Sequence, residues 1–136
     1  MLLAIDVGNT NTVFGVFSGD TLLAHWRTET TSRRTFDEYG ILMLQFFAHA
    51  GLDAKRVKAV IVSSVVPPLQ FNLEKMSERY FGQRATFVGP GVKTGMPILY
   101  DNPREVGADR IVNAVAAREQ CHSALIVVDF GTATTF

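Results

Sequence analysis

Two short segments carry residue types suited to handling phosphate groups. The first is Asp6-Val7-Gly8-Asn9-Thr10-Asn11-Thr12-Val13, and the second, near the end of the chain, is Asp129-Phe130-Gly131-Thr132-Ala133-Thr134-Thr135. Each follows an apolar run and has Asp-x-Gly before a stretch of hydroxyl or amide residues. Glycine lets backbone N–H groups approach phosphate oxygens, and short polar side chains add neutral donors. The repeated pattern predicts two matched hairpin turns that together bind one phosphate chain.

The carboxylates of Asp6 and Asp129 would repel phosphates unless a cation lay between them. We therefore expect metal ions at both, with Mg²⁺ held by Asp6 directly or through water. Either turn taken alone could be an ordinary hairpin. The two matched copies argue against chance, and they predict that Asp6 and Asp129 face one shared hollow.

A third segment, Gly107-Ala108-Asp109-Arg110, places a carboxylate and a guanidinium at a loop or helix start. Arg110 could clamp a substrate carboxylate, while Asp109 could accept a hydroxyl proton during phosphoryl transfer. From spacing alone, the more common alternative is a helix N-terminal charge beside a surface arginine. Both interpretations stay open at this point.

Hydrophobic patterning supplies the elements that must position these residues. Thr35 and Glu38 have capping-box spacing, and the apolar face of the helix they begin should include Ile41, Leu44 and Phe47. Ser63 and Ser64 end a β-branched run and are interpreted as local backbone partners outside the site. We expect strands at residues 2–7, 12–17, 21–28, 57–66, 85–88 and 124–130, and helices between Thr35 and Gly51, at 69–81 and across 111–117.

The composition limits the classes of partner. The 136 residues include 13 basic and 13 acidic side chains, so no net charge recruits nucleic acid or an anionic membrane. Cys121 is the single cysteine, which favours a reducing compartment. No apolar run approaches the roughly 20 residues of a membrane span, and no signal-peptide pattern opens the chain. We expect a cytoplasmic protein whose partner is a small molecule.

Taken in order, the motifs resemble those of type III pantothenate kinases. The resemblance is carried by Asp6 to Thr10, Ser63-Ser64-Val65-Val66-Pro67, Tyr100 to Pro103, Gly107 to Arg110, and Asp129 to Thr135. It covers essentially the whole chain. It implies an α/β fold of the actin-like ATPase (ribonuclease H-like) class, with a mixed sheet flanked by helices and a duplicated second subdomain. We expect the first subdomain at residues 1–122 and the start of the second at 123–136.

The resemblance also implies roles for single residues. Asp6 to Val13 would form the first ATP-binding turn, and Thr132 would contact ATP from the second. Tyr100 and the segment Gly107, Ala108, Asp109 and Arg110 would bind pantothenate, with Asp109 accepting the proton of its primary hydroxyl. Asp129 would hold a monovalent cation, K⁺ or NH₄⁺, beside Mg²⁺. The expected activity is the ATP-dependent first step of coenzyme A biosynthesis by a homodimer.

The family is about twice as long as this chain, which stops inside the second turn. We therefore expect the 136 residues alone to be inactive. Two alternatives remain beside pantothenate phosphorylation: a kinase of the same fold acting on another small hydroxy acid or sugar, and a non-catalytic regulatory homologue. The presence of Asp6, Asp109 and Asp129 argues against the second, because a binding module needs no such set.

Overall fold

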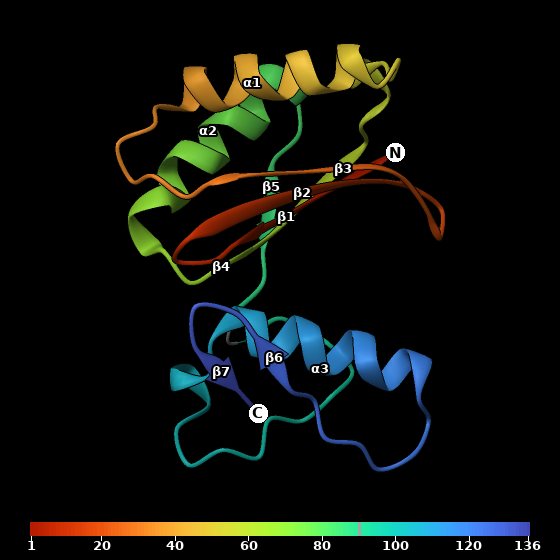
Figure 1. The fold of residues 1–136 in the computed structure, drawn as a ribbon, viewed down its shortest axis with the longest axis vertical. Coiled ribbons are helices and arrows are strands. Elements are labelled where there is room, and N and C mark those ends of the chain that lie inside the picture. Colours follow the sequence, from red (N-terminus) through yellow and green to blue (C-terminus); the bar gives the residue numbers. More distant parts are fainter. Residues whose placement is uncertain (90) are drawn as a thin grey trace.

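The computed structural model describes residues 1–89 and 91–136 and has two parts (Figure 1). The first contains a five-stranded sheet with two helices, and the second contains a third helix and a two-stranded hairpin. Within these ranges, no helix combines the length and apolar character that crossing a membrane requires.

The sheet has the strand order β3-β2-β1-β4-β5, which places β1 at its centre. Strand β1 pairs antiparallel with β2 and parallel with β4. Leu3, Ile5 and Val7 alternate along β1 and are buried on one face, so Asp6 points to the other. The strands are β1 (Leu2–Val7), β2 (Asn11–Ser18), β3 (Thr21–Glu29), β4 (Ala59–Ser64) and β5 (Ala85–Phe87).

Helices α1 (Phe36–His49) and α2 (Gln70–Phe81) cover the face of the sheet that Leu3 and Val7 share (Figure 1). The predicted capping box begins α1, with Thr35 and Glu38 each accepting from the other's backbone N–H. Gly82 ends α2 at a φ of 63°, a left-handed conformation that glycine adopts without strain. The core lies between these helices and the sheet.

The buried face of α1 differs from the prediction. Ile41 and Leu44 are 50% and 36% exposed, so the predicted apolar face is not the buried one at these two positions, whereas Phe47 is buried. The helix instead turns Gly40 toward α2. The Tyr80 ring of α2 occupies the space that a side chain at position 40 would fill. Close approach of the two helices therefore sets the orientation of α1. Its buried residues are Tyr39, Gly40, Met43 and Phe47.

The second part begins after β5 with a short 3-10 helix at Pro103–Glu105, followed by α3 (Ala108–Gln120). It ends in a hairpin of β6 (Asp129–Phe130) and β7 (Thr134–Thr135). The strand expected at 124–130 is thus wrong for residues 124–128. Within the described residues β6 has only β7 to pair with, and a strand without a partner gains no ladder hydrogen bonds.

The fold class is confirmed as a mixed α/β sheet flanked by helices. Strand β2 runs antiparallel to both neighbours, while β1, β4 and β5 are parallel. This mixed order agrees with the mixed sheet that the resemblance implies. The division into subdomains at residue 122 stays a prediction.

Candidate functional site

The first predicted turn joins β1 to β2. Gly8 donates its N–H to the carbonyl of Asn11 at 2.9 Å, and a Cβ on Gly8 would stand 3.2 Å from that same oxygen. The turn is therefore tight enough to favour glycine. Asn9, Thr10 and Asn11 are exposed at its tip and can reach a ligand, whereas Val7 and Thr12 are buried and can offer only their backbone.

Hydrogen bonds from Thr30, which lies between β3 and α1, hold the turn in place. Thr30 donates its N–H to the carbonyl of Thr10 at 2.8 Å, and the hydroxyls of Thr12 and Thr30 lie 2.8 Å apart. Thr12 was predicted to contact ATP, and its side chain is instead occupied by this internal contact. The hydroxyl of Thr12 thus holds the turn in place.

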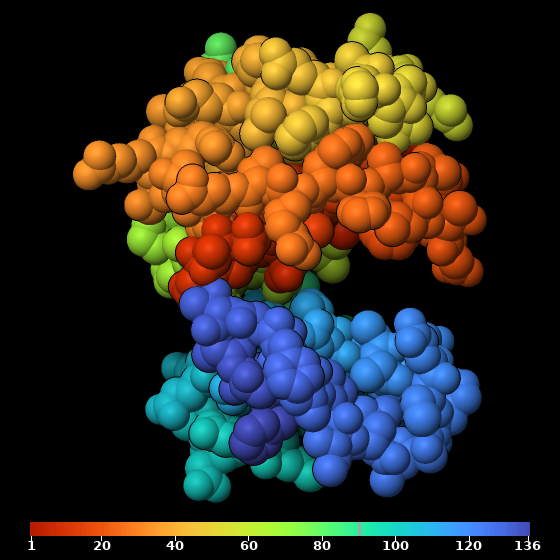
Figure 2. Space-filling view, viewed as in Figure 1, coloured from red at the N-terminus to blue at the C-terminus, as the bar shows by residue number. Residues whose placement is uncertain are grey.

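The second predicted turn meets the first. Gly131 donates its N–H to the carbonyl of Ala133 at 3.1 Å within the β6–β7 hairpin. Thr132, at the tip of this hairpin, lies 2.7 Å from Thr10, hydroxyl oxygen to hydroxyl oxygen. Figure 2 shows the same junction, where the red N-terminal residues contact the blue C-terminal hairpin and the surface is hollowed beside them. The two matched turns therefore lie side by side.

Asp6 shares this junction with the two other predicted carboxylates. Partial burial raises the pKa of Asp6 above its ordinary value, and the charges of Asp109 and Asp129 raise it further. The Ser63 hydroxyl, in register with Asp6 on β4, opposes the rise, although its geometry falls short of a hydrogen bond. The carboxylates of Asp109 on α3 and Asp129 on β6 therefore lie close enough to Asp6 on β1 for their charges to act on it.

Asp109 lies in the first turn of α3, where the helix dipole favours a negative charge. Its Oδ1 accepts a hydrogen bond from the backbone N–H of Arg110 at 2.8 Å. The same oxygen lies next to Gly107. A Cβ on Gly107 would overlap this oxygen. Gly107 therefore makes room for the position that the Asp109 carboxylate takes.

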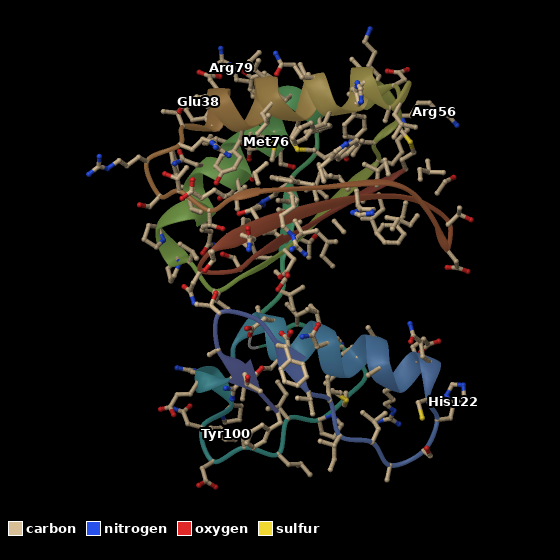
Figure 3. The ribbon with its side chains drawn as sticks, viewed as in Figure 1. Glu38, Arg56, Met76, Arg79, Tyr100 and His122 are labelled. Carbon is tan, nitrogen blue, oxygen red and sulfur yellow. The ribbon has the colours of Figure 1, made fainter. Side chains whose placement is uncertain are left out.

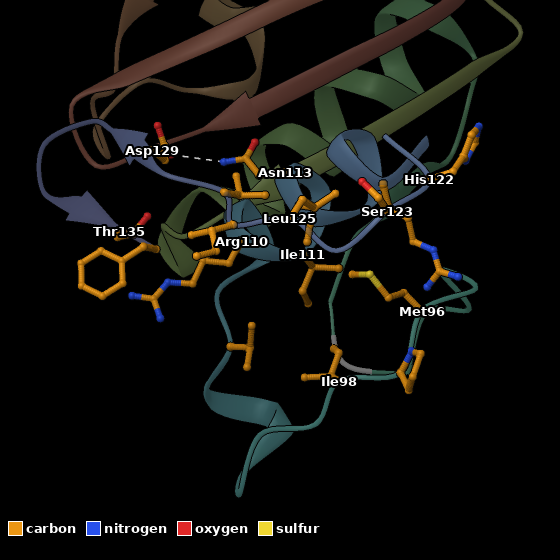
Figure 4. Close-up of a pocket in the computed structure, with 17 residues that line it drawn as sticks. Met96, Ile98, Arg110, Ile111, Asn113, His122, Ser123, Leu125, Asp129 and Thr135 are labelled. Atoms are coloured by element: carbon orange, nitrogen blue, oxygen red, sulfur yellow. Dashed lines mark hydrogen bonds between the residues drawn. The ribbon is translucent and has the colours of Figure 1, made fainter. Parts of the chain in front are cut away.

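A cavity of about 680 Å³ opens beneath α3 and borders this junction (Figure 4). Its polar lining includes Arg110, Asn113 and Asp129, and much of the rest is apolar. Asn113 donates its amide N–H to Asp129 Oδ2 at 3.2 Å. Tyr100, by contrast, is 56% exposed, lies away from the junction in Figure 3, and is not among the cavity's lining residues.

The carboxylates at the junction could hold a cation only if other ligands completed its shell. Among the described residues, no three His, Cys, Asp or Glu side chains converge closely enough to enclose a metal ion. Mg²⁺ in phosphate sites usually takes one or two carboxylates and completes its shell with waters and phosphate oxygens. Asp6 fits that pattern, and the mutual repulsion of the three carboxylates would be relieved by cations.

Sequence reasoning missed two residues of this site. Ser63 was interpreted as a local backbone partner, yet only Ser64 has that role, since it accepts the N–H of Val66 at 3.1 Å. Asn113 was not singled out, although it follows Asp109 by four residues, the spacing that places two side chains on one helix face. That spacing was the signal available in the sequence.

Comparison with known proteins gives one consistent family. The family model described as type III pantothenate kinase matches residues 2–136. A relative of that description from Myxococcus xanthus (strain DK1622) is 75% identical over all 136 residues, and one from Anaeromyxobacter sp. (strain K) is 68% identical. The chain covers 53% and 54% of those relatives, so it spans about half their length. Among solved structures, a ROK hexokinase from Thermus thermophilus aligns with 63% of this chain and 34% of its own at 17% identity, with a TM-score of 0.49.

Proposed function

The chain belongs to the type III pantothenate kinase family, and we propose that the full-length protein transfers the γ-phosphoryl group of ATP to the primary hydroxyl of pantothenate. The observation that carries the proposal is the contact between the two glycine turns, where Thr10 and Thr132 meet at 2.7 Å. Two turns that touch can hold one phosphate chain from both sides. The product, 4'-phosphopantothenate, would enter coenzyme A biosynthesis.

In this proposal the turns orient the phosphates, and the carboxylate of Asp109 receives the proton. The backbone N–H groups of Asn9 and Thr10 and the hydroxyl of Thr132 would face phosphate oxygens and align the γ-phosphorus with the attacking hydroxyl. As the new O–P bond forms and ADP leaves, Asp109 takes the hydroxyl proton. Its Oδ1 is occupied by the Arg110 N–H, which leaves Oδ2 free for this step.

Cations complete the proposed site. When bound, they would offset the charge of the phosphates and of the three carboxylates. Asp6 would hold Mg²⁺ through water, and Asp129 would hold a monovalent cation, K⁺ or NH₄⁺. Burial is the main cause of the raised pKa of Asp6, and the charges of Asp109 and Asp129 add to it; this added repulsion supports the assignment, because a bound cation would offset it.

Substrate binding is proposed for the region around α3. Arg110 lines the cavity of about 680 Å³ and can direct its guanidinium to the pantothenate carboxylate. Gly107 and Ala108 would contribute backbone at the start of the helix, and Tyr100 would join only if its loop moved. We propose that the 136 residues alone are inactive and that the full-length protein is a cytoplasmic homodimer, as the family resemblance implies.

A coupled ATP assay on the full-length protein tests the proposal, with pantothenate in the presence and absence of K⁺. Asp109→Asn should lower kcat by about 10²- to 10⁴-fold, the usual contribution of a general base. Asp20→Asn is the matched control, since Asp20 is an exposed turn residue outside the site.

The outcomes separate the competing functions. Undiminished turnover by Asp109→Asn would remove the general-base assignment. Turnover by the wild type with another hydroxy acid or a sugar, but not with pantothenate, would indicate a kinase of the same fold. No turnover with any cation would favour a regulatory homologue.

A further inference from the structure

Asn113 is connected to both carboxylates to which the proposed function gives different tasks: it shares α3 with Asp109 and donates a hydrogen bond to Asp129. It lies on α3 four residues after Asp109, so the two side chains share one face of the helix. Its Nδ2 donates to Asp129 Oδ2 at 3.2 Å (Figure 4). One helix therefore carries the proposed proton acceptor and also contacts the proposed cation ligand.

Asp129 has little else to hold it. It belongs to the two-residue strand β6, which pairs only with β7 in the described part of the chain. Within the same residues, Asn113 supplies the side-chain hydrogen bond that the Asp129 carboxylate receives. Without that bond the carboxylate could rotate about its side-chain torsions, because a short exposed hairpin gives it few packing neighbours.

The chemistry of the amide suits this contact. Asparagine is a poor residue for a helix interior, since its side chain competes for backbone hydrogen bonds. At position 113 the amide is half-buried and directed at a carboxylate, where a charge-assisted bond is stronger than a neutral one. A carboxylate has about four lone-pair positions, so one bond to Oδ2 leaves Oδ1 free to face a cation.

We infer that Asn113 is a positioning residue, which fixes the Asp129 carboxylate relative to Asp109 so that the cation site and the proton acceptor keep a set separation. The inference rests on the proposed function for the roles of Asp109 and Asp129. It adds a residue that acts through its hydrogen bond to Asp129. Loss of such an outer hydrogen bond typically lowers metal affinity or activity by about 10- to 100-fold.

The test compares two variants of the full-length protein with the wild type. Asn113→Leu keeps nearly the same side-chain shape and removes the donor, while Asn113→Ala removes both. Gln120→Ala is the control, because it truncates an exposed amide at the far end of the same helix. Turnover is measured against KCl at constant ionic strength, with choline chloride as the balancing salt. The K⁺-dependent rise in Tm without substrates gives a second measurement that does not depend on activity.

We expect both Asn113 variants to need about 10- to 100-fold more KCl for half-maximal turnover and to lose most of the K⁺-dependent rise in Tm. The KM for pantothenate should change less than the KCl requirement, and the control should match the wild type. A normal KCl response in Asn113→Leu would overturn the inference, because packing alone would then explain position 113. The inference would also be overturned if neither the turnover nor the Tm of the wild type changed with K⁺.

Failure of the proposed function gives a different pattern. If the wild type does not phosphorylate pantothenate but its Tm still rises with K⁺, and Asn113→Leu loses that rise, the activity is wrong and the positioning role stands. If pantothenate is phosphorylated and Asn113→Leu responds to K⁺ as the wild type does, the activity stands and the positioning role falls.

Discussion

The substitution Gly107→Ala should displace the Asp109 carboxylate while leaving the fold intact. The backbone at position 107 has φ −60° and ψ 146°, which alanine adopts without strain. The added Cβ would overlap Asp109 Oδ1, whereas its contact with Val65 Cγ1 at 3.6 Å is ordinary. The only group that must move is therefore the proposed proton acceptor.

The size of the effect follows from this overlap. Restoring an ordinary contact requires the carboxylate to shift by on the order of 1 Å, and a misplacement of that size can cost about 10²-fold in rate. Stability should change far less. Alanine is a poorer N-cap than glycine, which lowers the free energy of unfolding by about 0.5–1 kcal/mol. A large fall in kcat with a small fall in Tm is the expected combination.

The measurement is the coupled ATP assay on full-length Gly107→Ala, together with thermal unfolding of the same sample. Gly89→Ala is the control, because a Cβ at Gly89 meets nothing within 4 Å and its φ is not left-handed. If Gly107→Ala keeps wild-type kcat and Tm, the position of Asp109 described above is not the one used in turnover. Equal losses in both variants would point to a general effect of losing a glycine.

Three further outcomes are expected for the full-length protein. Thr10→Val should raise the KM for ATP by about 2- to 12-fold through loss of the hydroxyl that meets Thr132, and Thr10→Ser should restore it; no change in Thr10→Val would contradict the role of the turn. Gly40→Ala should lower the urea-measured free energy of unfolding by about 1–3 kcal/mol, because its Cβ would overlap the Tyr80 ring, and wild-type stability would show that the helices can separate freely. Asp6→Asn should raise Tm at neutral pH in the absence of metal and nucleotide. Because the folded pKa of Asp6 is raised, its ionised form destabilises the fold at neutral pH, and the gain should vanish as pH falls through that pKa; a gain that persists at low pH would contradict this cause.

Local sequence patterns were sufficient to predict most of the fold. Three of these patterns each extend over only a few residues, so they can be recognised without tertiary information. They are the alternation of buried and more exposed residues along Leu2–Val7, the capping box at Thr35, and the glycine that ends α2. The orientation of α1 could not be predicted in this way. Ile41 and Leu44 have helical spacing and enough hydrophobicity to be buried, yet the fit between Gly40 and Tyr80 turns them outward.

The site was predictable where a motif repeats and unpredictable where two segments meet. Asp6 and Asp129 were expected together because their turns match, and the structure brings those turns into contact. Ser63 required knowledge that β4 lies parallel to β1 in a register that pairs it with Asp6. No pattern within a single strand encodes that register, because it depends on how the helices cover the sheet.

The position of α3 explains why the three carboxylates form one group. Asp6 is fixed at the end of the central strand, while Asp129 sits on a short hairpin with few contacts of its own. The helix packs against β4, and it contacts Asp129 through Asn113, one turn after Asp109. A change in the tilt of α3 would therefore move Asp109 and Asp129 together relative to Asp6. Coupling through one helix would keep the proposed proton acceptor and the proposed cation ligand at a set separation.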